Sequence, residues 1–498
     1  MAAIYLAGFV QGLVSAYELI FSYIYKDSFS FSPAKANFIA ALYNVGCAIK
    51  PAWSALSDNV CFFGYKRKTY ITASGLIGGT ALLLLSMWNN HEIIGVSSII
   101  ALGCATTCSY CVAEALIIRT AFKSTPSTEY ETQQIISHNT SRFFALNYIG
   151  KLLIAICISI FLVGYGANVF LVFGSVLFFC MAFVGKTMSD IKVRKRNIGG
   201  TFNNLQNSDL DLTLEGESEM IQKEEENQKF SKQNIKKAMK YIRSPLMYKS
   251  SLLLFLRALT PNFRQVRFFY FTNWLGFDPS FIAFLRLISY VGMVLGLIAY
   301  NKGFKNMSFK RFYTFMSLVC AALTLIQLVL VFRANQSIGI SDGFFAIIDT
   351  LIVEISFELS AFTPFLIASK IAPKEVEGTI FAIVISVANI TQSLSMIVGS
   401  LLAEVLQIDS YAFDNYWILI VFTSASFLLT IPLARNINFD DIVERIATKD
   451  KKETEISTAP PSYEERLDDA DEKPTVKFTN PQTVYGELYK QDHFNTFS

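Results

Sequence analysis

The chain has 498 residues, of which 52% are apolar and only 17% are charged, and its formal net charge is +3. Soluble globular proteins carry about 25% charged residues, so this composition excludes an ordinary soluble domain and indicates a polytopic membrane protein. The small net charge gives no reason to expect a nucleic-acid partner.

Twelve apolar runs along the chain are long enough to cross a membrane as helices. The polar stretch between the sixth and seventh runs contains "DLDLTLEGESEM" and "KEEENQK", which cannot build a core and indicate a largely disordered linker. We therefore expect an all-α protein with two six-helix halves, residues 1–188 and 250–434, a linker at 189–249 and a largely disordered tail at 435–498. The expected spans are 4–25, 36–56, 69–88, 92–118, 141–163, 167–188, 250–274, 280–300, 312–332, 343–369, 378–406 and 415–434.

Basic residues predict the orientation, because lysine and arginine collect in short loops on the cytoplasmic side. With both termini in the cytoplasm, together with the linker and the tail, the outer loops hold only Lys26, Lys35 and Arg333. The sequence does not indicate whether the surrounding lipid is the plasma membrane or an internal membrane. The inner loops would hold Lys66, Arg67, Lys68, Arg119, Lys123, Lys302, Lys305, Lys310, Arg311, Lys370 and Lys374.

The loop after the second span reads "IKPAWSALSDNVCFFGYKRKTY". Major facilitators carry a Gly-x-x-x-Asp and then a Gly-x-Arg-Arg signature at this place, where it holds the cytoplasmic gate. The alternative is a basic loop that only sets orientation, and Ser54 stands where the signature prefers glycine. The residues that match, and that we assign to the gate, are Asp58, Gly64, Lys66, Arg67 and Lys68.

Four stretches together resemble the folate–biopterin transporter family of the major facilitator superfamily. They are "FVQGLVSAYEL", the loop quoted above, "TPNFRQVRFFYFTNWLGFDPSFIAFLRLI" and "GISDGFFAIIDTLIVEISFELSAFTPFLIASKIAPKEVEGTIFAIVISVANI". The resemblance covers most of residues 8–434. It implies a secondary transporter that moves a folate or pterin-like anion by alternating access, with no cofactor and no enzymatic activity.

Several positions depart from the pattern of that family and concern the substrate more than the fold. The family usually has two aspartates four residues apart in the fourth span, where this chain has Tyr110 and Glu114. Arg119 stands where the family often has an acid, and Arg264 and Arg267 stand where it often has small or apolar residues. One alternative is therefore a carrier of another metabolite, such as cationic S-adenosylmethionine. A second is a non-transporting receptor or adaptor.

The seventh span contains three arginines, which are costly at membrane depth and therefore suggest a function. At 100° per residue, Arg257, Thr260, Arg264 and Arg267 fall within roughly 80° of one another. Such a stripe must face a central cavity, with Leu253, Leu254 and Phe263 on the opposite face. We expect it to bind an anion, although one or two of the arginines would pair with acids, and Arg267 could snorkel to the outer surface. The predicted substrate-binding residues are Glu114, Arg142, Arg257, Thr260, Arg264 and Arg286.

The tenth span carries the opposite charge. Glu354 and Glu358 are four residues apart on one helical face, so their ionised forms destabilise each other. Asp349 lies on another face, and Arg286 is a candidate partner. We predict that these three acids couple transport to protons. The other ionisable residues expected within the spans are Glu18, Lys151 and Glu404.

The remaining motifs predict no metal site, and the tail motifs suggest a partner. Cys104, Cys108 and Cys111 share a helical face without a nearby histidine, which favours packing over metal binding. In the tail, "APPSYEE" contains Pro460, Pro461 and Tyr463, the pattern of Pro-Pro-x-Tyr ligands for WW domains. A WW-domain ubiquitin ligase is thus a candidate partner, and "YGEL" at 485–488 fits a tyrosine-based sorting signal.

Overall fold

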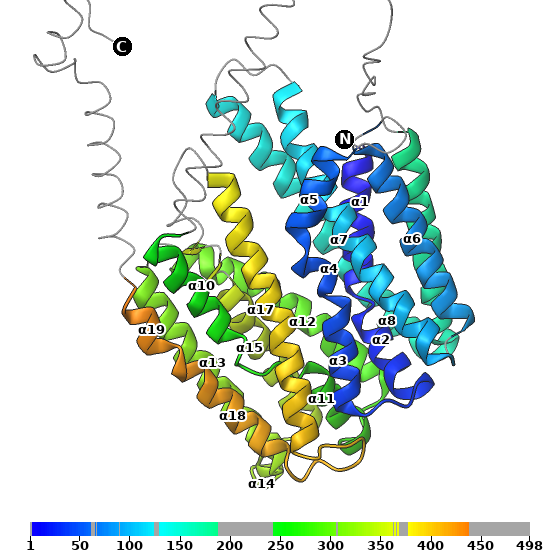
Figure 1. The fold of residues 1–498 in the computed structure, drawn as a ribbon. Helices are drawn as coiled ribbons and strands as arrows, with labels where there is room; N and C mark the ends of the chain where they lie inside the picture. The colour runs from blue at the N-terminus through cyan, green and yellow to red at the C-terminus, as the bar shows by residue number, and fades with distance from the viewer. Residues whose placement is uncertain are drawn as a thin grey trace, which may run out of the picture. The chain divides into compact units, whose positions relative to one another are not determined.

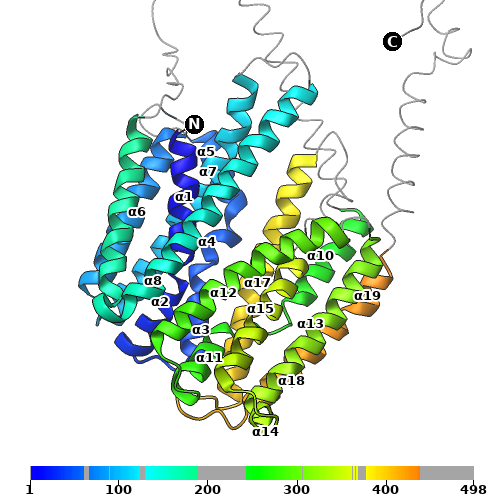
Figure 2. The same ribbon diagram turned by 180° about the vertical axis from the view of Figure 1, so that it is seen from behind.

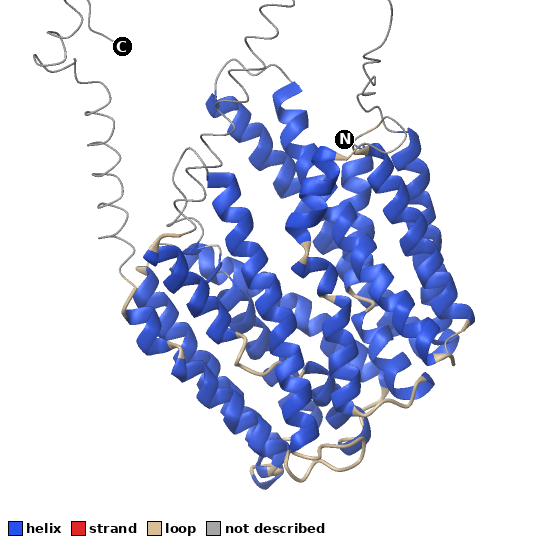
Figure 3. Ribbon diagram, in the orientation of Figure 1, coloured by secondary structure: helices blue, strands red, loops and turns tan. Residues whose placement is uncertain are grey.

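The computed structural model describes residues 2–60, 67–88, 90–123, 129–187, 243–304, 307–361 and 377–437, with single positions at 65, 363, 364, 366 and 367. Helices are the only regular elements in this part of the chain (Figure 3). Backbone contacts place the described residues in one compact unit. The expected tail motifs, and the predicted linker up to residue 242, lie outside the described residues.

The helices that precede the linker form one group (Figure 1). α8 runs through Gly166, whose φ of 73° breaks the helical path, so it corresponds to the predicted fifth and sixth spans. The elements are α1 (Ala2–Ser15), α2 (Glu18–Tyr23), the π-helix η1 (Ile24–Ser28), α3 (Pro33–Tyr43), α4 (Val45–Ala48), α5 (Lys50–Asn59), α6 (Lys68–Met87), α7 (Glu92–Lys123) and α8 (Glu129–Thr187).

The helices that follow the linker form a second group (Figure 2). The group begins five residues earlier than predicted, because Ser244 caps α10 by accepting a hydrogen bond from the Met247 amide at 3.2 Å. The elements are α10 (Pro245–Arg257), α11 (Arg264–Phe269), η2 (Tyr270–Trp274), α12 (Pro279–Ala299), η3 (Tyr300–Phe304), α13 (Phe309–Val331), α14 (Ala334–Ser337), α15 (Asp342–Ala361), α17 (Glu377–Val405), α18 (Tyr416–Leu429) and α19 (Ile431–Arg435).

Within the described ranges, nine helical segments are long and apolar enough to cross a membrane. They correspond to nine of the twelve predicted spans. The second and seventh predicted spans are interrupted helices, and the tenth, α15, carries four acidic residues along its length. The three exceptions are therefore spans with irregular backbone or buried charge, features tolerated at membrane depth only where protein or a water-filled cavity surrounds them.

The seventh predicted span is not the continuous helix that its apolar composition suggested. α10 ends at Arg257, the chain turns through residues 258–263, and α11 begins at Arg264. Pro261 lies in this break, where its missing N–H and its ring disfavour continuation of a helix. The second span is likewise interrupted, between α4 and α5, just before Pro51.

Polar contacts join the two groups where α3 meets α11 and α17. The Asn37 side chain donates hydrogen bonds of 2.8 Å to the carbonyl oxygens of Asn262 and Met396. Ser400 donates to the Ala34 carbonyl oxygen at 2.6 Å. In Figures 1 and 2 this junction lies at the same end of the bundle as α14. The orientation predicted from basic residues would make this the outer end.

Candidate functional site

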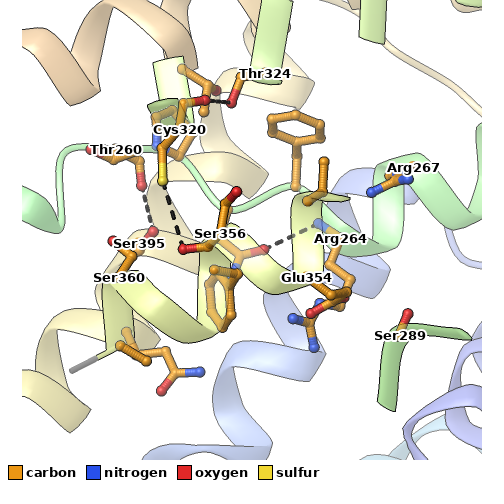
Figure 4. A pocket seen from close by; sticks show the side chains of 18 of the residues that line it. Thr260, Arg264, Arg267, Ser289, Cys320, Thr324, Glu354, Ser356, Ser360 and Ser395 are labelled. Carbon is orange, nitrogen blue, oxygen red and sulfur yellow. Dashed lines mark hydrogen bonds between the residues drawn. The ribbon is translucent and has the colours of Figure 1, made fainter. Parts of the chain in front are cut away.

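A cavity of about 450 Å³ lies within the second group of helices and reaches α2 of the first. Figure 4 shows this cavity from close by. A smaller cavity of about 250 Å³ is lined by residues from α1, α2, α3, α4 and α7. The two share Asn262, Arg264 and Gln392, so together they reach from one helix group to the other. This position suits a carrier that rocks two bundles about a central site.

The break in the seventh span builds one wall of the larger cavity. Thr260, Pro261 and Asn262 line it with their irregular backbone, and Ser395 of α17 donates a hydrogen bond to the Thr260 carbonyl oxygen. The predicted helical stripe is thus wrong in its geometry, because Phe263, placed on the opposite face, lines the same cavity. The expectation that the three arginines of this segment face a central cavity is nevertheless confirmed.

Two of the cavity arginines share one carboxylate. Nη1 of Arg264 lies 3.2 Å from both carboxylate oxygens of Glu18, and Nη2 of Arg286 lies 3.2 Å from Oε2 of the same residue. Glu18 is the first residue of α2, whereas the arginines belong to α11 and α12. This triad is therefore an ionic link between the two helix groups.

Arg267 has its own acidic partner. Its Nη2 lies 2.6 Å from Oδ2 of Asp349 and donates to the Thr350 hydroxyl at 3.2 Å. Asp349 is 5% exposed, so the pair is buried rather than a snorkelling contact at the surface. The prediction that Arg286 pairs with Asp349 is wrong, because Glu18 and Arg267 take those two roles.

Arg257 differs from the other three arginines of the cavity. It donates a hydrogen bond of 2.6 Å from Nη2 to the Ser360 hydroxyl on α15, and no carboxylate pairs with it among the described residues. Within the described ranges, its charge is therefore not neutralised by a neighbouring acid. A guanidinium in this situation is suited to bind a carboxylate of a ligand.

Glu354 and Glu358 both pack against a small-residue face of α12. A Cβ added at Gly292 would lie 3.0 Å from Cβ of Glu354, and one added at Gly296 would lie 2.9 Å from Cβ of Glu358. The close approach of α12 and α15 thus depends on these glycines. Glu354 lines the larger cavity, whereas Glu358 lines neither cavity and interacts electrostatically with Lys151 of α8.

Two predicted substrate ligands lie elsewhere. Glu114 forms an ion pair of 2.8 Å with Lys50, whose ammonium also lies 4.5 Å from the centre of the Tyr110 ring. Lys50 lies in the loop quoted above, and the sequence did not indicate that it pairs with Glu114. Arg142 is exposed and precedes the apolar segment Ala145–Leu162 of α8. Neither Glu114 nor Arg142 lines either cavity.

The predicted gate is described only in part. Gly64, Lys66 and the side chain of Asp58 lie outside the described residues. Arg67 donates a hydrogen bond of 2.8 Å to the Ala115 carbonyl oxygen of α7, and the Lys68 ammonium lies 5.0 Å from the centre of the Tyr65 ring. The start of α6 is thus tied to a neighbouring helix.

Uncharged amides complete the site, and sequence reasoning missed them. Asn262 and Gln392 line both cavities, and Gln265 lines the smaller one. Each of them is a polar side chain within an apolar run. Such a side chain is a weaker sequence signal of a binding site than a charged one. Among the described residues no cluster of histidine, cysteine, aspartate or glutamate could hold a metal ion. The arrangement offers arginines, one acid, amides and aromatic walls to an organic ligand.

Known proteins match this chain along most of its length. The folate-biopterin transporter of Synechocystis sp. is 25% identical over 424 residues, which cover 85% of this chain and 78% of the relative. Folate transporter 2 of Plasmodium falciparum is 25% identical over 454 residues, with 90% of each chain covered.

Solved structures of transporters share the fold at low sequence identity. The nucleoside transporter NupG superposes with a TM-score of 0.57 at 14% identity, covering 88% of this chain and 98% of that one. The xylose transporter XylE from E. coli in its inward open conformation gives 0.54 at 12% identity, covering 88% and 95%. These likenesses confirm the predicted major facilitator fold of a multi-pass membrane protein. A model of the BT1 family matches residues 10–457, and the chain therefore belongs to the BT1 family.

Proposed function

We propose that this protein carries a folate or pterin-like anion across a membrane by alternating access. The observation that carries the proposal is the unneutralised guanidinium of Arg257 in a cavity lined by four arginines and one acid. The names of the curated relatives, which describe folate and folate-biopterin transporters, supply the substrate class.

The walls of the cavity fit such a substrate in size and chemistry. A volume of about 450 Å³ lies within the range of roughly 300–1,000 Å³ usual for small-molecule sites. Phe263, Phe268, Phe271 and Phe357 supply aromatic surface for a flat ring. Arginines supply bidentate donors for a carboxylate. Transport breaks no covalent bond, so these residues need no cofactor.

The ionic link through Glu18 gives a way to couple binding to movement. An anionic substrate in the cavity attracts Arg264 and so competes with Glu18 for the charge of this arginine. Binding would therefore weaken the contact between the two helix groups and favour their rocking about the central site. The loop with Asp58, Gly64, Lys66, Arg67 and Lys68 would then act as the cytoplasmic gate.

The acids of α15 divide into different roles within this proposal. Asp349 neutralises Arg267, which leaves Glu354 and Glu358 for the coupling of transport to protons. Glu358 is the stronger candidate, because it interacts with Lys151 of the other helix group while lying outside both cavities. A proton on Glu358 would weaken its attraction to Lys151 without disturbing the bound substrate.

Uptake by liposomes containing the purified full-length protein tests the proposed function. We expect labelled folate to accumulate above protein-free liposomes and to be displaced by excess unlabelled folate or pterin. S-adenosylmethionine serves as a second labelled substrate, because an acid in the cavity could also suit a cation. Accumulation of S-adenosylmethionine without folate would assign another metabolite. Failure to move or bind either would favour a receptor or adaptor.

A further inference from the structure

One carboxylate in the larger cavity has an oxygen without a hydrogen-bond partner in the part of the chain that the structure describes. Glu354 is 8% exposed, and its Oε2 is buried with no hydrogen-bond partner among the described residues. No described residue forms an ion pair with it. Figure 4 shows its side chain beside Arg264, whose charge acts on it electrostatically, but the Arg264 guanidinium donates its hydrogen bonds to Glu18.

A buried acceptor without a donor is unusual enough to need an explanation, because its desolvation is not offset. The location of Glu354 limits the explanations. It lies on the cavity wall, so a bound ligand can bring the missing donors. Its own helix offers none within the described residues, and the α12 face opposite its Cβ is the bare backbone of Gly292.

The chemistry of a carboxylate selects the part of the ligand that it can bind. A carboxylate accepts two parallel N–H bonds from any group that presents them side by side, as a guanidinium does. A pterin has such an edge, formed by its 2-amino group and the neighbouring ring N3–H. The carboxylates of a folate, by contrast, would be repelled by Glu354 and attracted by Arg257.

We propose that Glu354 binds the amino-pyrimidinone edge of the pterin ring and thereby selects pterins and fixes their orientation in the cavity. This inference rests on the proposed function and adds to it a specificity residue and a direction for the substrate. The ring end lies at Glu354, and the acidic end of a folate lies toward Arg257.

The positions of the two groups on α15 support this direction. Arg257 donates a hydrogen bond to Ser360, which lies six residues after Glu354 on α15. Six residues correspond to about 9 Å along a helix axis. The acid and the unneutralised arginine are therefore well separated along one wall. Phe357 lies on that wall between them and supplies an aromatic face for the ring.

The test compares two pteridines that differ at the recognised edge. Pterin has an amino group at position 2, and lumazine has a carbonyl oxygen there, which turns a donor into an acceptor. Neither carries a carboxylate, so Arg257 does not bias the comparison. We expect the purified full-length protein to bind pterin at least about tenfold more tightly than lumazine, because lumazine would set an acceptor against Glu354.

Substitutions assign this preference to one residue. Glu354→Gln should bring the two affinities within about threefold, because an amide can both donate and accept. Glu354→Asp, which keeps the charge, should retain a preference for pterin. Glu404→Gln is the matched control, with the same charge change at an exposed position of α17 outside both cavities, and it should leave the wild-type ratio unchanged.

The outcomes separate the inference from the proposed function. If the wild-type protein binds pterin and lumazine equally while it transports folate, the role of Glu354 is refuted and the proposed function stands. An unchanged preference in Glu354→Gln also refutes it, and the wild-type ratio decides the matter if that variant does not fold. If no pteridine or folate binds at all, the proposed function fails as well.

Discussion

Glu18 and Arg264 form an ion pair across the two helix groups, with Nη1 of the arginine 3.2 Å from both oxygens of the glutamate. Arg286 adds a second guanidinium to the same carboxylate. Glu18 therefore neutralises two of the four arginines that line the larger cavity. Within the proposed function, this pairing lowers the positive charge that the cavity offers to an anionic substrate.

Glu18→Gln should tighten the binding of folate and slow its net transport. The substitution frees the charges of Arg264 and Arg286, which attract an anionic substrate, and it also removes the ionic link between the two helix groups. Since breaking a buried pair leaves charge uncompensated, we also expect a lower melting temperature in the absence of ligand. Equilibrium binding and liposome uptake measure the two effects. The control is Glu92→Gln, which breaks an exposed pair with Lys35; unchanged folate affinity in Glu18→Gln would contradict the prediction.

Arg257→Gln should weaken the binding and uptake of folate by about tenfold or more. A hydrogen bond to a charged group contributes about 1.5–3 kcal/mol, and glutamine replaces a charged donor by a neutral one. Arg264→Gln should also reduce folate uptake, but it disturbs Glu18 as well. Arg142→Gln is the control, because Arg142 is exposed and lies outside both cavities. Normal folate uptake by both cavity variants, at equal protein in the membrane, would refute the anion site.

Gly12→Ala should destabilise the first helix group. A Cβ at Gly12 would overlap the backbone carbonyl of Asn147 on α8, and backbone cannot move aside as a flexible side chain can. Overpacking of this kind costs about 1–3 kcal/mol of unfolding free energy. Thermal unfolding of the purified protein checks it. Gly164→Ala provides the control, since a Cβ there meets no atom within 4 Å, and equal melting temperatures for the two variants would argue against this packing.

The apolar pattern predicted the architecture well because spans are set by the thickness of the bilayer. It placed the start of the third span at 69, one residue from the start of α6 at Lys68. The prediction failed at the seventh span. It assumed one continuous helix with 100° per residue, whereas the chain turns at residues 258–263. Pro261 was the sequence signal of this break, because proline in a helix interior kinks or ends the helix.

The residues of the site were also easier to predict from the sequence than the ion pairs between them. The expectation that one or two of the three arginines in the seventh span pair with acids is confirmed, for Arg264 and Arg267. Sequence gives no distances, so it could not show that Glu18 takes two arginines. Glu114 was assigned to the substrate because its partner Lys50 lies 64 positions away on another helix.

Tyr463→Ala should slow the removal of the carrier from its membrane without changing transport per molecule. Pro460, Pro461 and Tyr463 lie outside the described residues, in a sequence with no apolar run that could line the substrate path. A WW-domain ubiquitin ligase bound there would modify lysines such as Lys449, Lys451 and Lys452. Surface half-life is measured beside uptake per surface copy. An unchanged half-life would remove this motif from the proposal, whereas Tyr485→Ala tests the sorting signal separately.

Glu358→Gln should uncouple transport from protons while leaving exchange of substrate intact. In the wild-type protein we expect folate uptake to rise with an inward proton gradient, because protonation of Glu358 weakens its attraction to Lys151 and eases movement of α15 relative to α8. A glutamine imitates the protonated acid permanently, so the gradient should lose its effect. Exchange of labelled for unlabelled folate needs no net proton movement and should continue.

Two further variants assign this coupling to the contact between the helix groups. Lys151→Gln removes the cation and should flatten the response to the gradient as Glu358→Gln does, whereas Glu404→Gln, at an exposed position near the end of α17, should leave it unchanged. Uptake at equal internal and external pH is compared with uptake under the gradient for each variant. If wild-type uptake ignores the gradient, proton coupling is excluded. If it responds but Glu358→Gln responds equally, the coupling acid is a different one, and Glu354→Gln is the next substitution to measure.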